Sequence, residues 1–457
     1  MPRVRLPALL PATAMAALAL LGLCATPVAA QSVLRDAETE ALFDDMARPL
    51  VAASGLGPGN VDIVLINDPQ VNAFVAGGQA VYVNSGLINE ANSAEEVQGV
   101  IAHELGHVTG GHAVLNPGGQ AASNISILSL LLGAAAAAVG GGEAAMGVVM
   151  AGQQAALGKY LSYSRSQEAS ADAAGAQYLS RAGISGRGSI AFFEKLQNLE
   201  FRYGYRAKDG DEFFTTHPLT GDRIATLQDT YEKDPAWSKP VDAVIQRRFE
   251  RVKAKLFGYL GEPRDTLRLY PATDNSVPAH YARAYAFHKD SQLDRAMAEA
   301  EALLTTAPDD PYFLELKGQI LLESGRPKEA LEPLRRAVEL TSNQPLIATL
   351  FGHALIATED PVHFKEAEPV LRAAVARDRE NPFAWYQLGV IYAAKGDMAR
   401  ARLASAEQQI LSGDPDNALI SARVAVAGLP QGSPDWLRAQ DIEMQVRAEL
   451  DREDKRR

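Results

Sequence analysis

Two patterns of hydrophobic and polar residues divide the chain. From about residue 31 to residue 230, short strand-like segments stand among helical ones, and the clearest is Ala80-Val81-Tyr82-Val83, between Gly77-Gly78 and Ser85-Gly86. A short apolar and aromatic run with turn residues on both sides is typical of a strand. We therefore expect residues 31–230 to form an α+β domain, mostly helical with a small β-sheet.

The second pattern is a repeat with a period close to 34 residues. Units that start at Val277, Pro311, Pro345 and Pro382 share a small residue seven positions on: Ala284, Gly318, Gly352 and Gly389. A second small position recurs at Ala296, Ala330, Ala367 and Ala401, and the last unit also carries Trp385, Leu388 and Tyr392. This spacing is typical of tetratricopeptide repeats, in which two antiparallel helices approach closely where side chains are small.

The repeats predict an all-α superhelix over residues 277–415. Residues 231–276 are expected to be a connecting helix and linker, and residues 416–457 a degenerate repeat and C-terminal cap. The last spacing is 37 residues, which we attribute to an insertion around Asp360-Pro361-Val362. An unrelated alanine-rich helical bundle is the alternative.

Residues 1–30 resemble an export signal. Arg3 and Arg5 precede an apolar run that reaches Leu23, and Val28-Ala29-Ala30 offers a small-residue cleavage site. We expect cleavage before Gln31 and a periplasmic protein. An uncleaved anchor helix and a lipoprotein modified at Cys24 are the alternatives.

The composition limits which residues could bind a metal and which partners the chain could have. Cys24 is the only cysteine, so any metal in the mature chain must be held by His, Asp or Glu. The formal charge is −12, and becomes −14 once Arg3 and Arg5 are removed. An acidic chain of this kind is not expected to bind nucleic acid.

An HExxH motif lies at residues 103–107, where Ala94-Glu95-Glu96-Val97 begins a predicted helix. Residues four apart share one helix face, so His103 and His107 can bind one Zn²⁺ per chain through imidazole nitrogens. Glu104 would then lie beside the metal and take a proton from the attacking water.

An acidic pair further along the chain is expected to supply the third metal ligand. Glu168 and Asp172 lie four residues apart on another predicted helix. We expect Glu168 to complete the metal site and Asp172 to accept the free N–H of a ligand imidazole. The alternative is a solvated helix face.

These motifs resemble the HtpX and CAAX-prenyl-protease family of gluzincin zinc metallopeptidases. The resemblance includes Asn72-Ala73-Phe74, the Val81 segment, the HExxH helix, Glu168-xxx-Asp172, and Thr216-His217-Pro218 with Arg223. With the signal and repeats, the chain is most similar to the periplasmic proteases that enhance β-barrel assembly. This implies cleavage of unfolded or misassembled proteins, and docking of the repeats onto the outer-membrane assembly machinery.

His217 and Arg223 have open roles. His217 precedes a proline and is expected in an extended loop, where it can stabilise the oxyanion, occupy the fourth zinc position as an inhibitor, or be structural. Arg223 can orient the site or begin a helix. Residues Ala80, Val81, Tyr82 and Val83 are expected to be an edge strand that pairs with extended substrate, with a core strand as the alternative.

The apolar insert 125–158 lies between the two ligand motifs, and residues 125–142 carry no charge. A single membrane crossing would place His107 and Glu168 on opposite sides of the bilayer, so we expect a helical hairpin over the cleft or in peripheral contact with a membrane. Two other functions remain open: a chaperone or adaptor with a largely latent protease, and a zinc-dependent hydrolase of other bonds.

Overall fold

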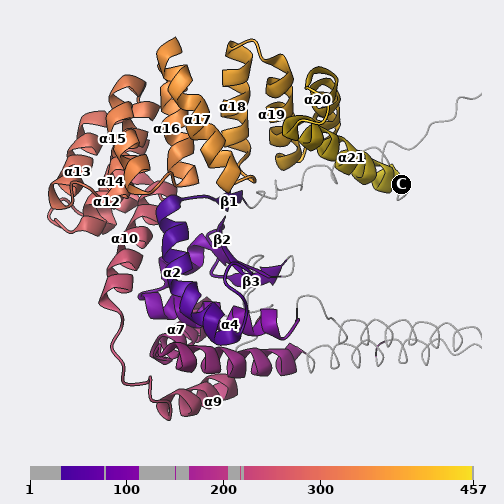
Figure 1. Ribbon diagram of the computed structural model, residues 1–457. Helices are drawn as coiled ribbons and strands as arrows, with labels where there is room; N and C mark the ends of the chain where they lie inside the picture. The colour runs from indigo at the N-terminus through magenta and orange to yellow at the C-terminus, as the bar shows by residue number, and fades with distance from the viewer. Residues whose placement is uncertain are drawn as a thin grey trace, which may run out of the picture.

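The computed structural model describes residues 32–76, 79–112, 150, 164–203, 217 and 221–454. A small α+β domain lies beneath an arc of paired helices that continues to the C-terminus (Figure 1). The predicted fold class, a mostly helical α+β domain followed by an all-α repeat superhelix, is confirmed.

The sheet has four strands in the order β1-β2-β4-β3. Strand β4 is parallel to β2 and antiparallel to β3. The strands are β1 (Ser32–Leu34), β2 (Asp62–Asn67), β3 (Ala73–Ala76) and β4 (Ala80–Asn84).

The prediction of an edge strand at residues 80–83 is wrong. Residues Ala80, Val81, Tyr82 and Val83 belong to β4, whose backbone pairs with β2 on one side and β3 on the other. Val81 and Val83 are fully buried, because this strand lies inside the sheet. Among the described residues, β3 lies at one end of the sheet and β1 at the other, so the order of the strands in the sheet differs from their order along the chain.

Helices α2 and α4 pack together against the sheet. The helices of this domain are α2 (Ala37–Ser54), α3 (Ser85–Glu90), α4 (Ala94–Thr109), a helix over residues 164–182, α7 (Arg187–Tyr203) and α9 (Gly221–Glu232). Helix α4 begins at the N-cap Ser93, whose Oγ accepts the N–H of Glu96 at 3.2 Å. Its Val97, Ile101 and Leu105 are fully buried and belong to the hydrophobic core of the domain, and all of α4 from Ala94 to His107 is buried.

The repeat helices begin where the sequence period predicts. Helices α12, α14, α16 and α18 start at Val277, Pro311, Pro345 and Pro382. The full set is α12 (Val277–Lys289), α13 (Leu293–Thr306), α14 (Pro311–Glu323), α15 (Pro327–Leu340), α16 (Pro345–Ala357), α17 (Pro361–Arg377), α18 (Pro382–Ala394), α19 (Met398–Leu411), α20 (Pro415–Gly428) and α21 (Pro434–Asp454). Helix α17 has 17 residues, against 14 in α13, α15 and α19, so the longer last period lies in its second helix.

Residues 231–276, which connect the two domains, pack against both the α+β domain and the repeats. This stretch contains α10 (Ala243–Leu260) and α11 (Pro263–Leu269). Phe249 and Val252 of α10 are buried in the core of the α+β domain, whereas Gly258 lies against the backbone of Ala282 in α12. This helix therefore joins the domains by packing.

A buried ionic cluster also joins the two domains. Lys255 is 4% exposed and binds Asp36, the N-cap of α2, while Glu38 accepts a hydrogen bond from the Tyr281 hydroxyl at 2.8 Å. Arg251 pairs with Glu38 and reaches Asp310 of the repeats at 2.7 Å. Buried charges are tolerated only when paired, so the first helix of the α+β domain is held on the repeats.

Two predicted segments lie outside the described residues: the signal peptide 1–30 and, apart from residue 150, the insert 125–158. Within the described ranges, none of the helices combines the length and apolarity that a membrane crossing requires.

Candidate functional site

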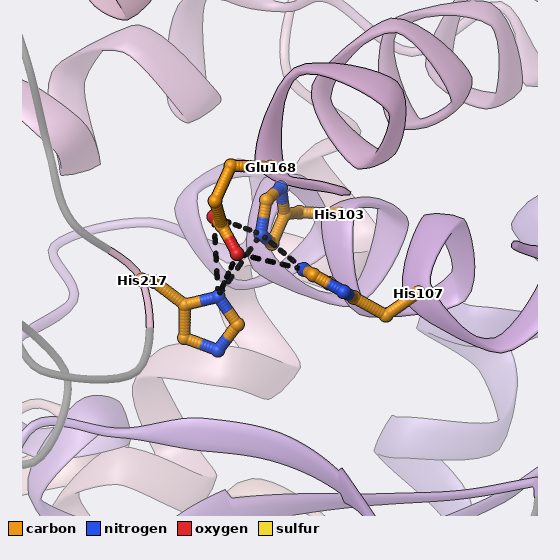
Figure 2. Close-up of side chains that lie close together, drawn as sticks. All are labelled: His103, His107, Glu168 and His217. Carbon is orange, nitrogen blue, oxygen red and sulfur yellow. Dashed lines mark hydrogen bonds and ion pairs between the residues drawn. The ribbon is translucent and has the colours of Figure 1, made fainter. Parts of the chain in front are cut away.

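Four buried side chains from three separate segments converge on one point (Figure 2). His103 and His107 come from α4, Glu168 from the helix over residues 164–182, and His217 from the segment before α9. One donor atom of each lies within 4.8 Å of the others. The structure thus brings together the three predicted metal ligands and His217.

Small residues allow the two ligand-bearing helices to approach so closely. A Cβ on Gly106 would lie 2.6 Å from the carbonyl oxygen of Ala171, and a Cβ on Gly175 would lie 3.0 Å from that of Ala102. Only glycine fits at such a helix contact without a backbone shift. The glycine inside the HELGH sequence therefore places Glu168 against the two imidazoles.

Most of the distances between the donor atoms are close to the edges of a zinc tetrahedron. His103 Nε2 lies 3.1 Å from His107 Nε2 and 3.4 Å from His217 Nδ1. Oxygens of Glu168 lie 3.4 Å from His103 Nε2, 3.3 Å from His107 Nε2 and 3.2 Å from His217 Nδ1. A tetrahedral zinc site with ligand distances of about 2.0–2.1 Å has edges of about 3.3–3.4 Å, so these residues fit the ion.

Asp172 and Arg223 surround the ligands on one side. Asp172 Oδ1 lies 3.0 Å from His103 Nδ1, the ring nitrogen that faces away from the cluster. Arg223, on the first turn of α9, binds both oxygens of Asp172 at 2.7 and 2.9 Å and reaches Glu168 at 3.0 Å. One guanidinium therefore fixes both carboxylates.

These contacts shift the pKa values of the three predicted ligands. Burial lowers the pKa of His103, but hydrogen bonds and charge from Asp172 and Glu168 outweigh it and raise it to about 10. Burial raises the pKa of Glu168, yet hydrogen bonds from the three imidazoles hold it far below its usual range. Burial together with the charge of His103 lowers the pKa of His107, so the site favours an ionised carboxylate.

Glu104 lies beside this cluster and is fully buried. Among the described residues neither of its carboxylate oxygens has a hydrogen-bond partner, although His217 Nε2 lies 3.6 Å from Oε1. A buried carboxylate with open acceptor positions is costly unless it receives a proton or a donor. Its place next to the predicted metal ligands suits the predicted role of a general base.

The sequence did not identify one histidine near this site. His112 lacks the sequence spacing of a metal ligand, yet its Nδ1 lies 2.9 Å from Nδ1 of His107. The signal that could have found it is Gly110-Gly111, because a glycine just past a helix end returns the chain towards the last turn.

Comparisons with known proteins agree with this geometry. Residues 34–231 match the model of peptidase family M48, and residues 281–345 and 363–418 match that of a tetratricopeptide repeat. The resemblance expected from the sequence, a metallopeptidase of this kind with repeats, is confirmed.

One relative is similar over most of this chain, and two others are similar over less than half of it. The chain is 26% identical to the β-barrel assembly-enhancing protease of Escherichia coli (strain K12), over 81% of this chain and 76% of that protein. It is 33% identical to the metalloprotease LoiP of Escherichia coli (strain K12), over 39% of this chain and 64% of that protein. It is 28% identical to the mitochondrial metalloendopeptidase OMA1 of Bos taurus, over 38% of this chain and 33% of that protein.

Proposed function

Because this chain carries a metallopeptidase domain of family M48 followed by tetratricopeptide repeats, we propose that it is a periplasmic zinc endopeptidase that cleaves unfolded or misassembled proteins. The observation that carries the proposal is the set of four donor atoms within 4.8 Å of one another, beside the buried carboxylate of Glu104.

His103, His107 and Glu168 are the proposed zinc ligands. Zinc at this position supplies a Lewis acid that polarises the peptide carbonyl and acidifies water. Asp172 Oδ1, which lies 3.0 Å from Nδ1 of His103, would accept the proton on that nitrogen and keep Nε2 free for the metal, while Arg223 holds Asp172 and Glu168 in place. Glu104 takes the proton of the attacking water and returns it to the leaving amine.

His217 is proposed to hold the enzyme in a latent state. Its Nδ1 lies 3.2 Å from Oε1 of Glu168, within reach of an ion held by the other three residues, and its Nε2 faces Glu104. In this position the ring occupies the space needed by water or a substrate carbonyl, so cleavage requires the His217 ring to leave it. The alternative role of transition-state stabiliser requires the ring to point at the substrate oxyanion instead.

Substrate is proposed to bind as an extended strand along β3. This strand has β4 on one side and forms the end of the sheet among the described residues. It also contacts α4, which carries the HExxH motif. An extended segment adds to such an edge through main-chain hydrogen bonds, so flexible segments would be cleaved in preference to folded domains.

The repeats are proposed to dock the enzyme onto the outer-membrane assembly machinery. Support comes from the repeat fold, and from similarity over most of the chain to a protease named for enhancing β-barrel assembly. The export-like residues 1–30 support the periplasmic location. A chaperone or adaptor with a largely latent protease is the second candidate, favoured by the position of His217.

The decisive experiment measures bound zinc and casein cleavage for the mature chain and three variants. We expect His103→Ala and Glu168→Ala to lose both zinc and cleavage. His363→Ala is the matched control, since His363 hydrogen-bonds Thr358 in the repeats, far along the chain from the site. Full zinc binding by Glu168→Ala would contradict the assigned ligand set.

A further inference from the structure

The turn that ends α4 places His112 directly behind a proposed metal ligand. Its Nδ1 lies 2.9 Å from Nδ1 of His107, and the two rings meet edge to face with centroids 4.9 Å apart. His107 directs its other nitrogen, Nε2, towards the cluster. His112 therefore contacts the nitrogen of His107 that cannot bind the same metal.

Two glycines produce this placement. Gly111 has φ +65°, and the N–H of His112 donates to the carbonyl of His107 at 3.0 Å, which closes the helix with a Schellman turn. A Cβ on Gly110 would lie 2.5 Å from Nε2 of His112, so an alanine there would displace the ring. Gly110 itself has φ −74°, which any residue adopts.

Only one direction of the hydrogen bond between His107 and His112 gives each ring nitrogen of His112 a partner. A metal ligand bound through Nε2 carries its proton on Nδ1, so His107 must be the donor to His112. His112 then carries its own proton on Nε2, which faces Ser170 Oγ at 3.3 Å. The Ser170 hydroxyl in turn donates to the carbonyl of Gln167 at 2.8 Å, one residue before Glu168.

We propose that His112 is a positioning residue: a neutral imidazole that accepts the Nδ1–H of His107, fixes its tautomer, and ties α4 to the helix that carries Glu168. In this role His112 accepts the Nδ1 proton of His107, as Asp172 is proposed to accept that of His103. The two supports differ in charge, since His112 adds no further negative charge beside Glu168 and Asp172. This inference rests on the proposed zinc site and deepens it.

The test compares zinc affinity, by competition with a chelator, for the parent chain, His112→Phe and His112→Asn. Phenylalanine keeps a ring of similar size but cannot accept the proton, and loss of such a partner weakens metal binding about 10- to 100-fold. Asparagine can place its amide oxygen near the position of Nδ1 and should retain most of the affinity. His363→Phe is the control for replacing a histidine elsewhere.

Gly110→Ala provides an independent test, because it leaves the His112 imidazole intact but removes the space it occupies. We expect this variant to weaken zinc binding in the parent chain and to have no further effect in a His112→Ala background. Additive effects in that double-mutant cycle would contradict the proposal.

Each outcome separates this inference from the proposed function. A parent chain that binds no zinc overturns both. A parent that binds zinc, with His112→Phe equally tight or with His112→Asn as weak as His112→Phe, overturns only the role of His112. Should the variants fail to fold, imidazole nitrogen NMR of the zinc-loaded parent decides, since a proton on Nδ1 of His112 is incompatible with the proposal.

Discussion

Nε2 of His217 lies 3.6 Å from Oε1 of Glu104. The same ring presents its Nδ1 to the proposed metal ligands, at 3.2 Å from Glu168. One imidazole thus lies against both a proposed metal ligand and the proposed proton acceptor. We predict that His217→Ala raises kcat for a flexible peptide by up to about tenfold, equivalent to about 1.4 kcal/mol in the barrier.

The contrary result would also be informative. A fall in kcat at unchanged KM would assign His217 to stabilisation of the transition state, and unchanged kinetics would make it structural. His353→Ala, in the repeat helix α16, is the control.

Glu104→Gln should separate metal binding from turnover. The amide has the size of the carboxylate but cannot take a proton, so we expect normal zinc content and a loss of about 10²- to 10⁴-fold in kcat. Cleavage at the parent rate would remove Glu104 from the mechanism. In cells, a peptidase would lose its phenotype with this variant, whereas an adaptor would keep it.

The raised pKa of His103 predicts how zinc binding depends on pH. Its value of about 10 in the metal-free chain means that the imidazole is protonated at neutral pH, and zinc must displace that proton. Apparent zinc affinity should therefore rise about tenfold per pH unit from pH 7 to 9 and level off above 10. Asp172→Asn removes one cause of the raised pKa and should flatten this slope; a flat profile in the parent chain would contradict the prediction.

Gly106 sets the distance between the two ligand helices. An added Cβ would lie 2.6 Å from the backbone of Ala171, so Gly106→Ala should push the helix of Glu168 away and cost roughly 1–3 kcal/mol in the free energy of unfolding. Zinc affinity should fall with it. Gly221→Ala is the matched control, because a Cβ there meets no atom of the described residues within 4 Å.

The repeat glycines are predicted to differ in tolerance. A Cβ on Gly318 would lie 2.3 Å from the buried Leu334 side chain, whereas one on Gly389 would lie 3.6 Å from its nearest neighbour, Ala404. Gly318→Ala should destabilise the chain by roughly 1–3 kcal/mol. Gly389→Ala should be neutral or stabilise by up to about 1 kcal/mol, because alanine favours a helix interior. Denaturant unfolding of both variants would test the contrast, and equal effects would contradict it.

Local spacing explains what the sequence alone determined. The HExxH motif predicts two imidazoles on one helix face because the helical repeat is local, and the 34-residue period predicts where α12, α14, α16 and α18 begin because each unit contacts mainly its neighbours. The fold class, the enzyme class and the type of repeat could all be predicted from such local patterns.

Only the tertiary structure decided which distant segments meet. The order of strands put β4 inside the sheet and β3 at its end, since strand pairing depends on the path of the whole chain. The contact of Gly106 with Ala171 set the distance from Glu168 to the imidazoles, and the turn at Gly110-Gly111 brought His112 behind His107. These relationships arise from packing between elements far apart in sequence or from the geometry of one turn, and neither leaves a periodic pattern in the residues.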